Sequence, residues 1–259
     1  MNVIIAIAGV VIKEMYRRKD FYVLFVLTVL ITLVMGSMNF FNDSGIVRYL
    51  KEVCLWLIWI AAFVIAIGTT ARQIPAEREN RTIFPLLAKP VSRAQVLLGK
   101  FLGCWLACGL ALLVFYLFFG AFAGLREHQW NLLSYFQGFW LQWVMLGIVT
   151  AFVLFGSIVF AAPSSNGTIS FILVLGILLL GGHLNKVALM QAEPMRSIVY
   201  SIYYLIPHLE WYDIRDKIMF NQQLVSWAYC GGVTFYAALY SAFLLLAAWL
   251  AFRRKALNL

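Results

Sequence analysis

Long runs of hydrophobic residues, separated by short stretches that carry nearly all the charges, dominate this sequence. Each run has about the 17 or more residues that an α-helix needs to cross roughly 30 Å of hydrocarbon. Backbone amides in lipid must find partners within the structure itself, which favours helices here. The pattern predicts an all-α polytopic membrane protein with six transmembrane helices, at Phe21–Phe41, Val53–Ala71, Val96–Ala123, Tyr135–Ala162, Thr168–Leu184 and Val225–Phe252.

The composition agrees with this pattern. Hydrophobic residues make up 63% of the 259 residues and charged residues 12%, which makes a soluble domain of this size implausible. The spans and their connections use nearly the whole chain, so residues 1–259 are expected to form one transmembrane domain. The N-terminus places its positive charges after its apolar stretch, the reverse of their order in a cleaved signal peptide.

Basic residues collect in alternate connections between the predicted spans. With the N-terminus in the cytoplasm, 13 of the 20 Lys and Arg residues but only four of the 11 acidic residues fall on the cytoplasmic side. This distribution follows the positive-inside rule and places both termini in the cytoplasm. The net charge of +9 is therefore attributed to topology, and no nucleic-acid partner is expected.

Residues 1–19 begin with an apolar stretch that is too short to span a membrane. Four basic residues follow it, Lys13, Arg17, Arg18 and Lys19. This order predicts an interfacial helix that lies along the inner leaflet. The alternative is a cytosolic extension of the first span.

The connection at residues 72–92 is the largest predicted cytosolic feature. Pro75 suits the first turn of a helix, and Glu77 and Glu79 then lie near its positive end. Glu77 and Arg81 are four residues apart and can pair on one face. We expect a helix of about ten residues here, although these charges are also compatible with a simple solvated face.

The third span begins with a clear helix-start signal. Ser92 and Gln95 have the spacing of a capping box. The helix that follows is longer than the bilayer requires, so its base is expected to project into the cytoplasm. Small residues recur on one face of it, which allows close packing either within the chain or between two copies. They are Gly99, Gly103, Ala107 and Ala111.

Two further connections have distinct compositions. The stretch Pro163–Thr168 is short and uncharged and is expected to be a second cytosolic loop. The outer segment, residues 185–224, is long and carries four tyrosines and one tryptophan, side chains that settle at the membrane–water boundary. Within it we predict a short amphipathic helix at Met195–Ile206, ended by Pro207; a solvated loop with anchoring aromatics is the alternative.

Several kinds of chemistry lack their residues in this chain. No charged side chain lies in the central part of a predicted span, where ion-driven transporters carry them. The sequence contains no phosphate-binding loop of the GxxxxGK[ST] type. The four cysteines fall within the spans and are interpreted as packing residues. The chain is therefore not expected to be an enzyme or to bind a metal or cofactor, and any energy input must come from another subunit.

At residues 72–100 the chain resembles the permeases of type-2 ATP-binding-cassette exporters. The resemblance extends to the six spans and to the basic N-terminal helix. The matching residues are Glu77-Arg78 with Thr82, Leu86-Leu87, Pro90-Val91-Ser92-Arg93, Gly99-Lys100 and the stretch Tyr203–Glu210. Pro85 departs from the pattern by falling within the expected coupling helix.

This resemblance implies that transport and ATP hydrolysis are carried out by different subunits. Two permeases form the substrate path, and two separate P-loop ATPase subunits bind ATP and Mg²⁺ beneath them. The loop at residues 72–92 then inserts a coupling helix into the ATPase, Pro163–Thr168 is a lesser contact and residues 185–224 cap the exit. The implied coupling residues are Glu77, Arg78, Glu79, Arg81, Thr82, Ile83 and Phe84.

The expected function is that of the transmembrane subunit of an ATP-driven exporter in the cytoplasmic membrane of a bacterium or archaeon. Its second permease is another copy of the chain or a related one, and membrane lipids surround both. Spans without buried charge weakly favour a lipid-like or amphipathic substrate. The alternative is a membrane anchor or assembly subunit that transports nothing.

Overall fold

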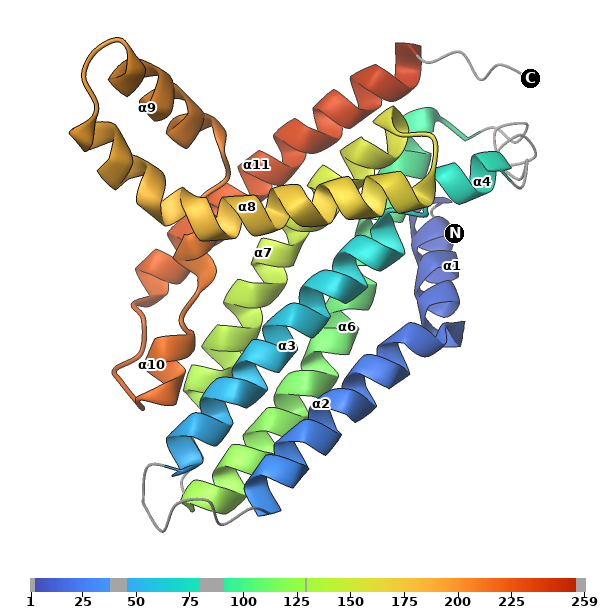
Figure 1. Ribbon diagram of the computed structural model, residues 1–259. Helices are drawn as coiled ribbons and strands as arrows, with labels where there is room; N and C mark the ends of the chain where they lie inside the picture. The colour runs from blue at the N-terminus through green and yellow to red at the C-terminus, as the bar shows by residue number, and fades with distance from the viewer. Residues whose placement is uncertain (1–2, 38–45, 80–90, 129, 255–259) are drawn as a thin grey trace.

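The computed structural model of the protein describes residues 3–37, 46–79, 91–128 and 130–254, and these ranges are almost entirely helical. Figure 1 shows the helices in a tilted bundle; α8 crosses the front of it, and the end of α8 projects at the upper left together with α9. In chain order the helices are α1 (Val3–Arg17), α2 (Lys19–Ser37), α3 (Ile46–Thr70), α4 (Pro75–Glu79), α6 (Arg93–Glu127), α7 (Leu132–Val159), α8 (Pro163–Met190), α9 (Met195–Leu205), the 3₁₀ helix η1 (Leu209–Tyr212), α10 (Arg215–Met219) and α11 (Trp227–Arg254).

Five segments of the described chain are long and apolar enough to cross a membrane. The first of the six predicted spans is seen as the shorter apolar helix Phe21–Val34, and residues 38–41 of that prediction lie outside the described residues. The prediction is therefore confirmed for five spans, and the first stays a prediction. The five segments are Val47–Glu79 (α3 with α4), Arg93–Glu127, Leu132–Val159, Pro163–Met190 and Trp227–Arg254.

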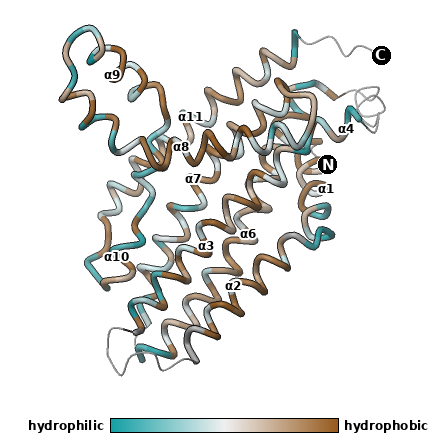
Figure 2. The backbone as a smooth tube through the Cα atoms, viewed as in Figure 1, coloured by the Kyte–Doolittle hydropathy of each residue, from teal (hydrophilic) through white to brown (hydrophobic). Residues whose placement is uncertain are grey.

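The bundle has two distinct ends. The start of α1, α4 and the end of α11 lie together at one end, here called the terminal end (Figure 1). The start of α3, the end of α6 and α10 lie at the opposite end, called the far end. Hydrophobic residues dominate the lengths of the helices, and hydrophilic ones gather near α4, around α10 and at the far end (Figure 2). This distribution is what a bilayer around the middle of the bundle requires.

Glycines on α6 receive the N-terminal helix. A Cβ atom at Gly99 would lie 2.8 Å from Cβ of Ile7, and one at Gly103 would lie 2.7 Å from Cβ of Val11. Only a residue without a side chain allows this approach. At these two positions the predicted stripe of small residues is therefore a seam inside the chain, and α1 packs on α6 instead of resting on lipid alone.

The central helices α6 and α7 are joined by a reciprocal pair of tryptophans. The rings of Trp105 and Trp143 stack with centroids 4.8 Å apart. The indole N–H of Trp105 donates to the carbonyl oxygen of Trp143 at 2.9 Å, and the indole of Trp143 donates to that of Trp105 at 3.1 Å. Gly109 faces the Trp143 ring directly, and Gly147 faces that of Trp105. Each indole thus has its single donor satisfied without water.

Two boundaries differ from the sequence prediction. Pro163–Thr168 is not a loop: Pro163 is the first residue of α8, a position that proline favours, and the turn before it is only a few residues long. Residues 185–190 of the predicted outer segment continue α8. Both errors arise because polar residues near the ends of α8, among them Asn166 and Lys186, interrupt its apolar run, so hydrophobicity alone does not mark where the helix begins and ends.

Two other predictions are confirmed. The Ser92–Gln95 capping box forms, with the Ser92 hydroxyl accepting from Gln95 N at 3.2 Å and the Gln95 side chain accepting from Ser92 N at 2.9 Å. The amphipathic helix predicted at Met195–Ile206 is α9, which ends one residue earlier, and it packs on α8.

We predict that Gly109→Val destabilises the fold, because the new side chain meets the Trp143 indole and separates α6 from α7. Overpacking of this kind costs about 1–3 kcal/mol. The thermal unfolding midpoint in detergent, followed by circular dichroism, measures the effect. Gly232→Val is the matched control, since nothing lies within 4 Å of a Cβ at Gly232. Equal midpoints for the two variants contradict the packing argument.

Candidate functional site

The segment after α3 forms the predicted coupling region at the terminal end. Residues 71–74 make a turn, and α4 begins at Pro75 as the sequence predicted. The turn is held by backbone hydrogen bonds, among them Gln73 N to Thr70 O at 3.1 Å and Ala76 N to Arg72 O at 3.0 Å. The described part of the helix ends at Glu79. Arg81, Thr82, Ile83 and Phe84 lie outside the described residues, as does the predicted pairing of Glu77 with Arg81.

A buried lysine ties this segment to α6. The ammonium group of Lys100 lies 2.6 Å from Oε1 of Glu77 and donates to Oε1 of Gln73 at 3.2 Å. The Lys100 side chain is 3% exposed and that of Glu77 is 29% exposed. An ion pair this well shielded keeps much of its strength. Glu77 therefore holds α4 against the base of the third span.

The neighbours of Glu77 have different surroundings. Arg78 is half-buried, and its Nε and Nη2 atoms have no hydrogen-bond partner among the described residues. Glu79 is exposed. Of the predicted coupling residues that the structure describes, Glu79 is the one whose side chain is free to meet another protein.

Asn166, on α8, joins that helix to α7 and to the turn after α3. It is completely buried, and its amide nitrogen lies 3.2 Å from the carbonyl oxygens of Ala71 and Val153. Its Oδ1 accepts from Ser170 at 3.2 Å, and a side chain at Gly156 would collide with that same oxygen. The first turns of α8 are therefore bound both to the turn before α4 and to α7.

A groove of about 700 Å³ opens beside Asn166. Its walls come from the end of α3, from the turn and α4, and from the start of α8. Arg72 and Glu79, both exposed, lie among its lining residues together with Ser164 and Thr168. The structure thus brings the described start of the first stretch that the sequence proposes as a contact, residues 72–79, and the second stretch, residues 163–168, to one surface.

Arg93, from the Pro-Val-Ser-Arg motif, has a structural contact of its own. Its guanidinium donates to the carbonyl oxygens of Phe252 at 2.6 Å and Arg253 at 3.2 Å, and it lies over the Phe252 ring. These are carbonyls at the C-terminal end of α11, where the helix dipole favours a cation. The contact fixes the base of α6 to the last helix.

A second buried charge lies at the far end. Lys51, which the sequence assigned to an outer loop, is on α3 and is completely buried. Its ammonium group lies 2.8 Å from Oε1 of Glu127 and 2.9 Å from Oδ1 of Asn221. Asn221 has a left-handed backbone, with φ of 50°, and also accepts from Asn131. The cluster binds the chain after α10 to α3, α6 and the start of α7.

Other contacts attach the second half of the outer segment to the bundle. The Arg215 guanidinium lies 3.8 Å from the centroid of the Trp56 ring and 4.3 Å from that of Trp59. Gln137 forms two hydrogen bonds with the backbone of Val225, at 2.9 and 3.1 Å. Tyr212 donates to the carbonyl oxygen of Val233 at 2.7 Å, and burial raises the pKa of its hydroxyl, so it remains a donor. These contacts attach this part of the segment to α3, α7 and the start of α11.

Sequence reasoning missed most of these polar partners. In the sequence, Lys100 stands out only as part of the Gly-Lys motif, and Asn166 is only one residue of an uncharged stretch. A useful signal was available, because single polar residues inside or beside apolar helices need partners and usually find them on another helix. The described residues contain no group of histidine, cysteine or acidic side chains suited to a metal ion.

The fold and these contacts define a class of protein: a polytopic helical membrane protein with an ordered, charged segment attached to the ends of its spans. Comparison with known sequences makes the class specific. The family described as "ABC-2 family transporter protein" matches residues 5–255, and the chain belongs to this family. It is accordingly an integral membrane protein of the transporter permease type. Among curated proteins, none matches it in sequence.

We predict that Asn166→Ala destabilises the terminal end, because the substitution leaves buried carbonyl groups without their donor. The expected cost is about 1–3 kcal/mol. The thermal unfolding midpoint in detergent reports it. Ser165→Ala, at an exposed neighbour, is the control and is expected to change stability by less than about 0.5 kcal/mol. If the two variants unfold at the same temperature, the Asn166 amide does not hold α8 to its neighbours.

Proposed function

We propose that this chain is the membrane subunit of an ATP-driven exporter, working as a pair of permeases with two P-loop ATPase subunits. Family membership supports a transporter subunit. The proposed setting is the cytoplasmic membrane of a bacterium or archaeon, with the terminal end in the cytoplasm. ATP and Mg²⁺ bind to the ATPase, and this chain needs no cofactor of its own.

One observation carries the coupling part of the proposal. The segment around α4 is attached to α6 through Lys100 and Glu77, and to α7 and α8 through Asn166 and the carbonyl of Ala71. A force applied to α4 therefore reaches three spans through buried polar contacts. Movement of an ATPase can change the spans only through an element that is held differently in the two states of the complex.

The proposed contact surface includes the groove between α4 and the start of α8. Arg72 and Glu79 present opposite charges there. Charges at the edge of an interface mainly orient the partners, whereas apolar anchors hold them. Ile83 and Phe84 are the proposed anchors, with Arg81 and Thr82 beside them. Glu77, engaged with Lys100, transmits the motion instead of making the first contact.

We predict that reversing one charge of the Glu77–Lys100 ion pair uncouples ATP hydrolysis from the permease. Reversing both charges should restore the coupling. Glu77→Lys or Lys100→Glu alone places like charges side by side, and the double variant recovers attraction. The measurement is the permease-dependent part of ATP hydrolysis in proteoliposomes containing the ATPase that purifies with the chain. The double variant is expected to regain at least half of the parent rate. Single variants as active as the parent exclude this pair from coupling.

We also predict that Glu79→Lys reduces permease-dependent ATP hydrolysis without changing the fold, because it reverses a charge at the docking surface. Helix content and unfolding temperature should stay at the parent values. Asp216→Lys, an exposed reversal at the far end, is the control and should leave hydrolysis unchanged. Equal hydrolysis for all three proteins, or a chain that purifies without any ATPase, supports the non-transporting anchor function instead.

A further inference from the structure

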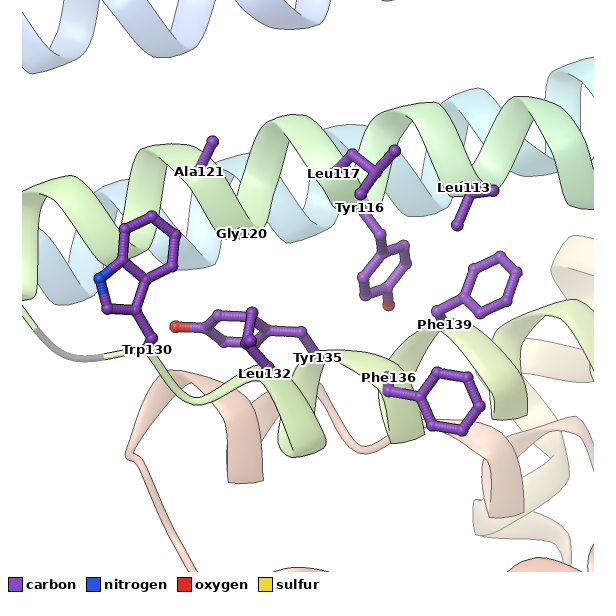
Figure 3. Close-up of a pocket in the computed structure, with 10 residues that line it drawn as sticks. All are labelled: Leu113, Tyr116, Leu117, Gly120, Ala121, Trp130, Leu132, Tyr135, Phe136 and Phe139. Atoms are coloured by element: carbon purple, nitrogen blue, oxygen red, sulfur yellow. The ribbon is translucent and has the colours of Figure 1, made fainter.

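A partly enclosed cavity of about 370 Å³ lies between α6 and α7, toward the far end. This volume is within the range of about 300–1,000 Å³ that is usual for small-molecule sites. Figure 3 shows its lining: the wall on α6 runs from Leu113 to Ala121, the wall on α7 from Leu132 to Phe139, and Trp130 stands at one end. The cavity is separate from the coupling segment around α4. It is also separate from the polar cluster of Lys51, Glu127, Asn131 and Asn221 at the far end.

The residues of the inner wall of the cavity are buried, whereas those at its rim are exposed. Tyr116 and Tyr135 are each 5% exposed and form part of the inner wall, whereas Leu117 is 64% and Leu132 62% exposed. The cavity therefore opens sideways from the bundle. Both helices that form it are long and apolar enough to span a membrane, so what meets the opening is the hydrocarbon of the bilayer.

One polar group inside this apolar lining has no partner among the described residues. The hydroxyl oxygen of Tyr135 is buried without a hydrogen bond, and it points toward Trp130 at the end of the cavity (Figure 3). The other tyrosine is occupied, because Tyr116 donates to Gln142 at 3.0 Å. A buried hydroxyl without a partner is costly in surroundings of low polarity. Its position calls for a ligand that brings a hydrogen-bond acceptor.

Depth in the membrane narrows the choice of ligand. Tyr135 is in the first turn of α7, within about 5 Å of the start of the helix at a rise of roughly 1.5 Å per residue. Trp130 just precedes that helix. Tryptophan and tyrosine at such positions mark the boundary between hydrocarbon and headgroups, which is where the ester carbonyls of a phospholipid lie. An ester carbonyl accepts hydrogen bonds and donates none.

We propose that this cavity holds one acyl chain of a resident diacyl phospholipid, from the leaflet at the far end, with an ester carbonyl accepting from the Tyr135 hydroxyl. The chain lies between Leu113, Leu117 and Phe136, and Trp130 covers the ester end. The lipid stays with the protein as part of its structure and is not the transported substrate. Because the site lies on α6, α7 and the connection between them, this proposal does not depend on the coupling scheme.

The test separates the hydroxyl from the cavity itself. The full chain is reconstituted in vesicles of phosphatidylethanolamine and phosphatidylglycerol with a trace of a phospholipid that carries a photoreactive diazirine on one acyl chain. After illumination, peptide mass spectrometry maps the labelled residues. Competition by unlabelled diacyl lipid is compared with competition by the dialkyl ether analogue, which has the same chains but lacks the carbonyls.

The parent protein is expected to be labelled on residues 113–121 and 132–139, with the ester lipid competing about two- to tenfold better than the ether lipid, the factor that one hydrogen bond supplies. Tyr135→Phe should abolish this preference while keeping the labelled positions. Gly120→Leu, which fills the cavity from a position with only ordinary contact to Tyr135, should reduce the labelling at least threefold. Gly182→Leu on α8, with open space around it, should not.

Three results would overturn the proposal: labelling spread evenly along the lipid-facing helices, labelling unchanged in Gly120→Leu, or an ester preference that persists in Tyr135→Phe. Transfer of the labelled lipid out of the site during ATP hydrolysis by the complete complex would also overturn it, since the lipid is then cargo. Misfolding does not explain the expected pattern, because Tyr135→Phe keeps the ring and changes only the ratio between two competitors.

Discussion

The absence of water from the bilayer core is the constraint on which this structure depends. A polar side chain that enters the bundle therefore needs a hydrogen-bond partner other than water, and most find one on the protein itself. The indoles of Trp105 and Trp143 each donate to the backbone of the other residue, and Asn166 donates to the turn after α3 and to α7. These polar contacts, together with the glycine seam between α1 and α6, decide which helices are neighbours, while the long apolar runs decide that the segments are helices in a membrane.

The same constraint explains why the two ends of the bundle are firmly connected. At the terminal end, Lys100 and Glu77 join α6 to α4. At the far end, Lys51 joins α3 to Glu127 and to the chain after α10. Breaking a shielded ion pair by removing one partner costs about 3–5 kcal/mol. Such pairs separate only when a new partner or water replaces the lost one, so they favour movement of helices as units over bending within them.

Much of the fold was predictable because its signals are local. Long apolar runs located the spans, a serine and a glutamine located the start of α6, and a proline located the start of α4. The ends of α8 were not predictable in this way, since Asn166 and Lys186 are polar residues within a helix. Whether a polar residue ends a helix or binds a neighbour depends on what lies beside it in space.

In the candidate site, too, local features were predictable from the sequence, whereas contacts between distant residues were not. The sequence indicates a charged segment at residues 72–92; the structure describes residues 72–79 of its first part, and α4 begins at Pro75, where a helix is expected. The sequence does not show that Glu77 forms an ion pair with Lys100, because a partner more than 20 residues away on another helix leaves no periodic signal. The pair of Lys51 and Glu127, 76 residues apart, was hidden for the same reason.

The seating of α1 on Gly99 and Gly103 has a consequence for how the protein is made. The surface that receives α1 belongs to a helix that leaves the ribosome more than 90 residues later. At about 5–20 residues per second, this interval lasts on the order of 5–20 s. During that time the apolar face of α1, including Ile7 and Val11, has only the membrane surface to cover it. The N-terminal helix thus rests on the membrane surface during synthesis and packs into the bundle once the third span has been inserted.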